Sequence, residues 1–430
     1  MGHIESVLES RTSAWMAAAG GMALMFGHAA YATDTSDAYA SWKEDLKAQG
    51  VQYAAGYRSE DLAAVDGGSN NDVVHAGQVF LSSTFDLQQL AGWRGASVTA
   101  SLSLRDGDNV NDESGVGALL GPQEIYGRGH YFRLSQLWLD QQLFADQLAL
   151  RIGRLNPGED FQATECSFLN LSFCANQAGN FVADYWFNWP ISQWGATATL
   201  QLGTEHYVRL GAYQVNQRNL GSDFWDVLRF DGGAGVLVPA EFAWTPTAEN
   251  GRMTEFKIGG WYSSADRADV EEDINGESAA VSGLPFREHN GTYGTFVSLV
   301  KQLTRGDASS AESGLRMVLK VSMADPDTST VDRTIAGTLV YTGTFPSRGR
   351  DDVGLALAFN HLNDRVADYR QALPSDVQYG GNERTIEAYY SLRVGRYLMF
   401  RPDIQWIHNA GGISQRDDVL IVGMRTELTL

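Results

Sequence analysis

The sequence predicts an all-β protein, a transmembrane antiparallel up-and-down β-barrel of about 16 strands. Three observations lead to this prediction. Apolar and polar residues alternate with a period of two, in segments of about ten residues, which suits a tilted membrane strand. The connections between these segments alternate between long and short. The chain is rich in glycine (46) and aromatic residues (11%) and poor in proline (10), a composition typical of strands.

Charge and hydropathy narrow the class further. The 430 residues carry a net charge of −20, which argues against nucleic acid as a partner, because nucleic acid requires a basic face. No window holds the roughly 18 uninterrupted apolar residues of a membrane helix. The negative charge suits long solvent-exposed loops that carry carboxylates.

The N-terminus has the features of an export signal. Residues 15–32 are apolar or small and end in Ala-Tyr-Ala, a cleavage pattern, so we expect a signal peptide over 1–32 and a mature chain from Thr33. A buried N-terminal helix is the alternative. A short, partly helical periplasmic segment is expected over 33–50, and the barrel over 51–430.

The last segment shows the alternation best. Leu420, Val422 and Met424 form one apolar face, whereas Arg425 and Glu427 point to the other. Similar segments occur near residues 52–58, 75–87, 96–104, 131–143, 148–154, 195–201, 207–214, 235–244, 253–263, 292–303, 313–323, 334–344, 352–361, 385–395, 398–408 and 419–429.

Connection lengths indicate which rim of the barrel is which. Residues 58–75 and 105–130 are long connections, 88–95 and 145–147 are short ones, and 155–194 is the longest. This alternation is typical of short periplasmic turns and long extracellular loops. A barrel of about 16 strands has a lumen too wide for side chains to fill, so we expect a water-filled channel in the bacterial outer membrane.

The two cysteines, Cys166 and Cys174, lie close together in the longest connection. In an exported protein such a pair favours a disulfide. Two free buried thiols are the alternative, and a zinc site would need further ligands nearby.

Several segments resemble the carbohydrate-selective outer-membrane porin family, the OprB-like porins. The resemblance covers most of 148–430. The matching segments are RIGRLNPGEDF, CSFLNLSFC, DYWFNWPISQWGATATLQ, YVRLGAYQVNQRNL, GAGVLVPAEFAWTP, YLMFRPDIQWIHNAGG and DDVLIVGMRTELTL.

The resemblance implies a monomeric or loosely associated barrel that passes glucose and other small sugars by facilitated diffusion. It also implies that the loop over about 156–190 folds into the barrel and narrows it, with the expected disulfide limiting its freedom. The alternative is a loop that points outward and whose disulfide serves only to resist proteases. The loop offers polar groups that suit sugar hydroxyls: Glu159, Asp160, Glu165 and Asn170.

Basic residues at inward positions of the predicted strands are candidates to face this loop across the lumen. Together with the loop carboxylates they would set a transverse field. A structural ion-pair lattice is the alternative for any one of them. They are Arg133, Arg151, Arg209, Lys257, Arg316, Lys320, Arg393, Arg401 and Arg425.

Two further features have simpler interpretations. Trp186, Trp189 and Trp194 fit an interfacial girdle or loop packing better than a sugar-stacking track. The carboxylates of 271–273 and 325–327 fit solvated loop charge better than a calcium site, because no complete EF-hand loop is present. No metal, cofactor or catalytic residue is therefore predicted.

Other functions remain open at this point. A β-rich glycosidase would need a defined carboxylate pair, and no Ser nucleophile lies in a G-x-S-x-G context. A porin for other small solutes and a secreted carbohydrate-binding protein are the remaining alternatives. The expected partners are small sugars, the lipid and lipopolysaccharide of the outer membrane, and the barrel-assembly machinery.

Overall fold

A computed structural model describes residues 32–125, 129–182, 185–222, 224–246, 253–305, 313–345 and 347–430. Within these residues, sixteen antiparallel strands form a closed barrel in which β1 pairs with β18. The predicted fold class and strand number are confirmed. The predicted signal segment lies outside the described residues, except for Ala32.

Each barrel strand coincides with one of the segments predicted from alternation. The strands are β1 (Val51–Asp66), β2 (Val74–Asp86), β3 (Ala96–Gly107), β4 (Tyr131–Leu143), β5 (Leu148–Leu155), β6 (Gln193–Leu202), β7 (His206–Val215), β8 (Gly235–Trp244), β9 (Thr254–Ser263), β12 (Thr292–Gln302), β13 (Gly314–Ala324), β14 (Val331–Thr342), β15 (Asp352–Leu362), β16 (Asn382–Val394), β17 (Leu398–His408) and β18 (Val419–Thr429).

Strand β15 shows how the two faces of the barrel differ. Val353, Leu355 and Phe359 point outward and are exposed, whereas the alternating Ala358 and Asn360 point inward and are fully buried. Because successive side chains of a strand point to opposite faces, the whole apolar set lies on the outer wall. An apolar outer band over a polar interior is what a barrel in a bilayer requires.

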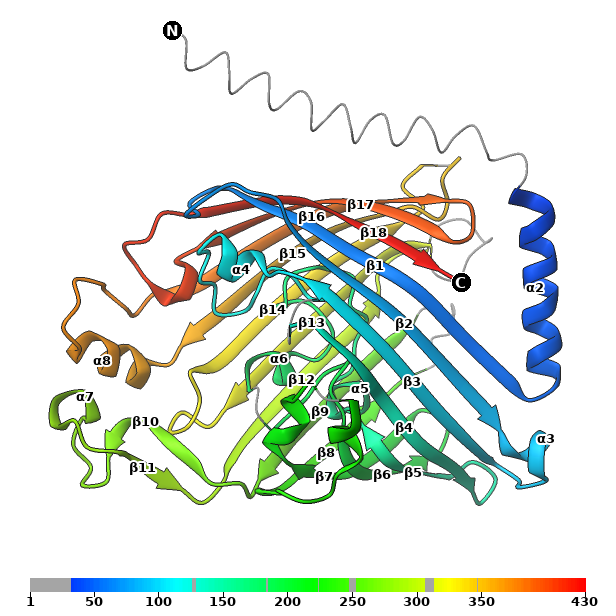
Figure 1. Ribbon diagram of the computed structural model, residues 1–430, viewed down its shortest axis with the longest axis horizontal. Coiled ribbons are helices and arrows are strands. Elements are labelled where there is room, and N and C mark those ends of the chain that lie inside the picture. Colours follow the sequence, from blue (N-terminus) through cyan, green and yellow to red (C-terminus); the bar gives the residue numbers. More distant parts are fainter. Residues whose placement is uncertain are drawn as a thin grey trace, which may run out of the picture.

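The two rims of the barrel differ in their connections (Figure 1). The long-loop rim carries eight loops, which we number L1 to L8, and the other rim has short turns. The loops comprise residues 67–73, 108–130, 156–192, 216–234, 264–291, 325–330, 363–381 and 409–418. L1 is shorter than predicted because β1 continues to Asp66, and L6 is also short.

The helices lie in these connections and at the N-terminus. They are α2 (Ala32–Ala48), α3 (Leu87–Ala91), α4 (Val110–Glu113), α5 (Pro157–Asp160), α6 (Gln177–Phe181), η2 (Gln217–Leu220), η3 (Phe224–Leu228), α7 (Ala279–Ser282), α8 (Asp364–Ala372) and η4 (Ala410–Gly412). L5 also contains a two-stranded hairpin, β10 (Arg267–Asp273) and β11 (Phe286–His289), which alternation did not predict. Among the described helices, none is both long and apolar enough to cross a membrane.

Candidate functional site

Loop L3, residues 156–192, enters the barrel and packs on its inner wall. The ring centroid of Phe161 lies 6.3 Å from that of Tyr213 on β7 and 6.2 Å from that of Trp186, and all three rings are buried. Trp186 in turn lies 5.3 Å from Trp261 on β9. Figure 1 accordingly draws α5 and α6 within the outline of the barrel. This aromatic packing fixes the beginning and the end of L3 to one side of the lumen.

Two buried lysines of the wall bind the backbone of L3. Lys320 Nζ on β13 donates to the carbonyls of Phe173 (2.7 Å) and Ala175 (2.6 Å). Lys257 Nζ on β9 donates to the carbonyl of Ala163 at 2.8 Å. Both ammonium groups are turned to the loop, so they attach it to the wall and do not face open water.

Arginines continue this attachment on both sides. Arg401 of β17 donates to the carbonyl of Ser167, and Arg209 of β7 donates to the carbonyl of Asp160. Arg151 of β5 binds the Asp160 carboxylate at 2.8 Å. Charge-assisted hydrogen bonds are stronger than neutral ones, so these contacts restrain L3 more than ordinary loop contacts would.

Wall carboxylates bind the N–H groups of the same loop. Glu387 of β16 accepts from the backbone N–H of Leu169 (2.6 Å) and Asn170 (2.9 Å), and Glu241 of β8 accepts from that of Gln162 (2.6 Å). Both carboxylates are almost fully buried. These acids were missed, although their inward parity on alternating strands was a usable signal.

The ring closed by the cysteines carries two apolar side chains into the opposite wall. Phe168 and Phe173 pack on each other at 5.5 Å, and Phe168 packs on Tyr389 of β16 at 4.9 Å. A Cβ at Gly354 would lie 2.2 Å from the Tyr389 ring, so glycine is required for this close approach. Small inward residues of β14 and β15 complete the cluster: Ala336, Ala356 and Ala358.

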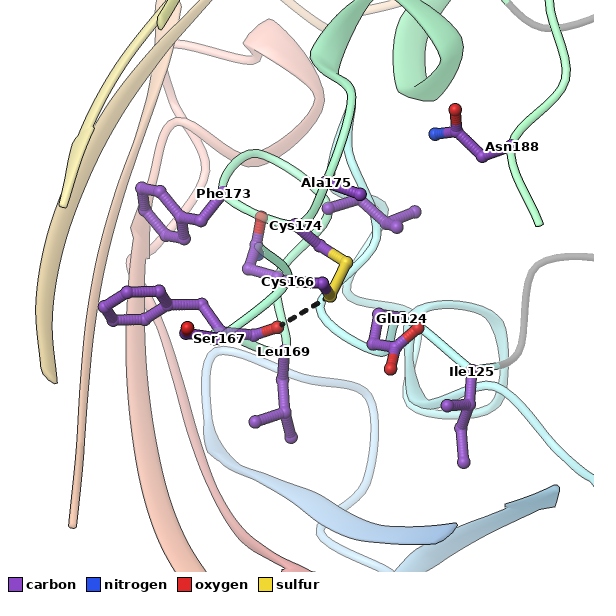
Figure 2. Close-up of a disulfide and its surroundings, with 12 residues drawn as sticks. Glu124, Ile125, Cys166, Ser167, Leu169, Phe173, Cys174, Ala175 and Asn188 are labelled. Atoms are coloured by element: carbon purple, nitrogen blue, oxygen red, sulfur yellow. Dashed lines mark hydrogen bonds between the residues drawn. A yellow bond between two sulfur atoms is a disulfide. The ribbon is translucent and has the colours of Figure 1, made fainter. Parts of the chain in front are cut away.

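The predicted disulfide between Cys166 and Cys174 is present. Figure 2 shows it with Glu124 of L2 on one side and the ring of Phe173 pointing away towards the strands on the other. One Glu124 oxygen and both sulfurs lie within 4.8 Å of one another. Because both sulfurs are bonded to each other, they are not available as thiolate ligands for a metal.

Removing this disulfide is expected to lower stability but not to open the channel. The Cys166→Ser, Cys174→Ser double variant should lose roughly 2–3 kcal/mol of unfolding free energy, because the bridge closes a short ring. The wall contacts of Lys320, Glu387 and Arg401 remain. Single-channel conductance, compared with that of the wild type, should therefore change little. A large rise would make the disulfide the main restraint on L3.

Loop L2 is also bound to the inner wall, on the part formed by β16, β18 and β1. Glu383 of β16 accepts from the N–H of Leu119 at 2.7 Å. Glu124 contacts Arg58 of β1 at 2.6 Å and Arg425 of β18 at 3.0 Å. L2 and L3 therefore meet inside the barrel, where Glu124 lies beside the disulfide.

Several charged side chains keep access to the lumen. Glu165, just before the disulfide, is 59% exposed and pairs with Arg316 of β13. Arg58 pairs with Glu427 at 3.1 Å, and Glu159 of L3 is exposed. The open part of the lumen thus carries the ion pairs Arg316–Glu165 and Arg58–Glu427, together with the Glu159 carboxylate, which accepts from the Gln136 amide.

The structure places the other predicted site residues as follows. Arg133 is buried and donates to the carbonyls of Asn219 (3.0 Å) and Gly221 in L4. Arg393 lies at the short-turn rim, 3.4 Å from the Asp352 carboxylate. Most of the nine basic residues thus bind loops to the wall or pair with carboxylates. A structural network of ion pairs and hydrogen bonds therefore describes them better than a set of unpaired charges that would create a field across the lumen.

Two predicted sugar-facing groups of L3 are turned away from the lumen. Asn170 is 0% exposed and donates to Gln405 of β17 at 3.2 Å. Asp160 is buried and accepts from the hydroxyl of Tyr213 at 2.9 Å. The expectation that they offer polar groups to a passing sugar is wrong, because wall partners already use these groups.

Two of the three tryptophans, Trp186 and Trp194, show the packing favoured from the sequence. Trp186 belongs to the buried cluster of L3, and Trp194 of β6 stacks on Phe230 of L4 at 4.2 Å. Neither is free to form an aromatic track along the lumen.

A closed sixteen-stranded barrel with an apolar outer wall and a long loop bound to its polar inner wall is the architecture of a porin. The chain belongs to the carbohydrate-selective porin, OprB family, whose model matches residues 70–430.

Individual relatives agree with this family. The chain is 32% identical to Porin B of Pseudomonas aeruginosa, over 94% of this chain and 95% of that protein. It is 31% identical to the putative porin QuiX of Acinetobacter baylyi, over 90% of each. The high-pH structure of Pseudomonas putida OprB superposes with a TM-score of 0.86 at 30% identity, covering 91% of this chain and 97% of that one. The family and the fold therefore indicate an outer-membrane channel and not an enzyme.

Proposed function

We propose that this porin passes small carbohydrates such as glucose across the outer membrane by facilitated diffusion, and that L3 forms its narrowest part. One observation carries the proposal: buried wall residues of both signs hold L3 inside the lumen. A loop held in this way keeps one shape, which a passage selective by size and polarity requires. The short-turn rim then faces the periplasm, and the signal peptide over 1–32 is removed on export.

Paired charges along the open lumen support a neutral, hydroxyl-rich cargo. Arg316 with Glu165 and Arg58 with Glu427 offer donors and acceptors side by side while adding no net charge. Sugar hydroxyls can use both kinds of group in turn, whereas an apolar solute would only separate these pairs from water. A porin for other small polar solutes is the alternative.

Planar-bilayer recording with sugar titration tests this proposal. We expect the purified protein to form channels whose ion current falls as glucose is added. Absence of channels would contradict the porin function. Channels that glucose neither blocks nor crosses, together with passage of other small solutes, would favour the alternative.

Neutralising one member of a lumen pair should change ion selectivity. Arg316→Gln leaves the Glu165 carboxylate without its partner, so the cation-to-anion permeability ratio should rise by about twofold. Glu165→Gln should move the ratio the other way, and the double variant should return it near wild type. Lys301→Gln is the matched control, because Lys301 points outward from β12. Reversal potentials in a salt gradient measure the ratio, and unchanged values for both single variants would place this pair outside the ion path.

A further inference from the structure

Two acidic segments at the long-loop rim meet at one arginine. Residues 271–273 belong to the β10–β11 hairpin of L5, and 325–327 belong to L6. Arg365, in the first turn of α8 in L7, lies between them. Three loops that are far apart in the sequence therefore share one guanidinium group.

The guanidinium group contacts four carboxylates. Its Nη2 lies 2.9 Å from Asp269 Oδ1 and 3.5 Å from Glu272 Oε1. Its Nε lies 3.1 Å from Glu271 Oε2, and its Nη1 binds Asp327. The Arg365 side chain is 22% exposed and that of Asp269 is 1% exposed, so water screens these contacts only in part.

Further hydrogen bonds position Arg365 between the loops. The Asn363 side chain caps α8 by accepting from the N–H of Arg365 at 3.1 Å, and it donates to the carbonyl of Ser329 in L6 at 2.8 Å. The N–H of Val270 in L5 donates to the carbonyl of Asp327 in L6 at 3.0 Å. Asp269 also lies 2.8 Å from His289, the last residue of β11.

The buried face of α8 extends this connection to L2. Val366 and Ala367 are buried in a cluster with Leu362, and Leu119 of L2 and Val270 of L5 pack against it. Since L2 is bound to the inner wall, α8 joins the L5 hairpin to a loop inside the lumen. Figure 1 shows α7, α8, β10 and β11 grouped at this end of the barrel.

We propose that Arg365 is the positioning residue that holds L5, L6 and L7 together and thereby limits the size of solute admitted at the long-loop rim. The inference rests on the channel function proposed above, and not on the identity of its cargo. Without the guanidinium group, three carboxylates of β10 and one of L6 repel one another, and the hairpin separates from α8. The entrance then widens while L3 stays in place.

Polymer exclusion tests this inference on the reconstituted full chain. Polyethylene glycols of rising mass are added from the long-loop side, and the largest polymer that still lowers single-channel conductance is determined. For Arg365→Met we expect this mass limit to increase by about twofold, and added protease to cut L5 faster.

Arg287→Met is the matched control. Arg287 binds Glu272 at 2.7 Å, but both residues lie in the same hairpin. Its replacement therefore removes no contact between different loops. The control should keep the wild-type mass limit. If Arg365→Met fails to fold, judged by heat-modifiable gel mobility, Arg365→Lys should give a smaller increase in the same direction.

An unchanged mass limit in the folded Arg365 variant would overturn the inference, with or without faster cleavage of L5. An equal increase in the Arg287 control would also overturn it. Because the polymers are not sugars, a channel that fails to pass glucose would contradict only the proposed cargo and leave this measurement valid.

Discussion

Replacing Lys320 with methionine is expected to release the disulfide ring of L3 from the wall and to raise channel conductance. The ammonium group binds the carbonyls of Phe173 (2.7 Å) and Ala175 (2.6 Å), and it lies 3.4 Å from the Thr164 hydroxyl. Methionine has a similar length but donates no hydrogen bond. The buried carbonyl of Phe173 would then lose its charged partner, at about 1–3 kcal/mol, whereas the carbonyl of Ala175 would keep the Thr164 hydroxyl that donates to it at 3.0 Å.

The effect on conductance should exceed that of removing the disulfide. The disulfide joins two parts of L3 to each other, whereas Lys320 joins L3 to the barrel. Single-channel conductance and hydrogen exchange of residues 164–175 measure the change, and Lys301→Met is the control that removes an outward lysine. Normal conductance with full exchange protection in Lys320→Met would show that Glu387, Arg401 and the phenyl rings suffice.

The fold was predictable because a barrel strand carries its signal locally. Alternation with a period of two fixes which residues face lipid, as in Val353, Leu355 and Phe359 of β15, and no knowledge of distant partners is needed. The β10–β11 hairpin was missed because it lacks this alternation. It packs on α8 and not on a membrane, so it has no apolar outer face to mark it.

The site was predictable only in part. The alternation of the strands correctly predicts that the side chains of Lys320 and Arg401 point into the barrel. It does not predict which groups they contact. What they bind is the backbone of L3, whose path inside the lumen depends on contacts with many strands. The loop acids were chosen by composition alone, so Asp160, which the wall buries, and Glu165, which stays exposed, could not be distinguished.

Breaking the buried ion pair at the closure of the barrel should have the largest effect on stability. Glu60 of β1 and Arg425 of β18 face each other in the register that closes the sheet, and both are almost fully buried. Arg425 also binds Glu124 of L2 at 3.0 Å. Arg425→Met would leave the carboxylates of Glu60 and Glu124 without the cation that they share, although Arg58 still binds Glu124. Removing one partner of a buried pair costs about 3–5 kcal/mol.

The double variant Glu60→Gln, Arg425→Met separates the role of the charges from that of packing. Because it removes one charge of each sign and leaves the local net charge as in the wild type, it should recover more than half of the stability lost in Arg425→Met. The unfolding free energy of both variants is measured by denaturant titration, with heat-modifiable gel mobility as the readout of the folded fraction. A double variant as unstable as the single one would mean that the Glu60 carboxylate itself helps to close the barrel, for example through the N–H of Ile125 that donates to it at 3.5 Å. Recovery would mean instead that β1 and β18 pair by backbone register alone, and that the ion pair serves to hold L2 against them.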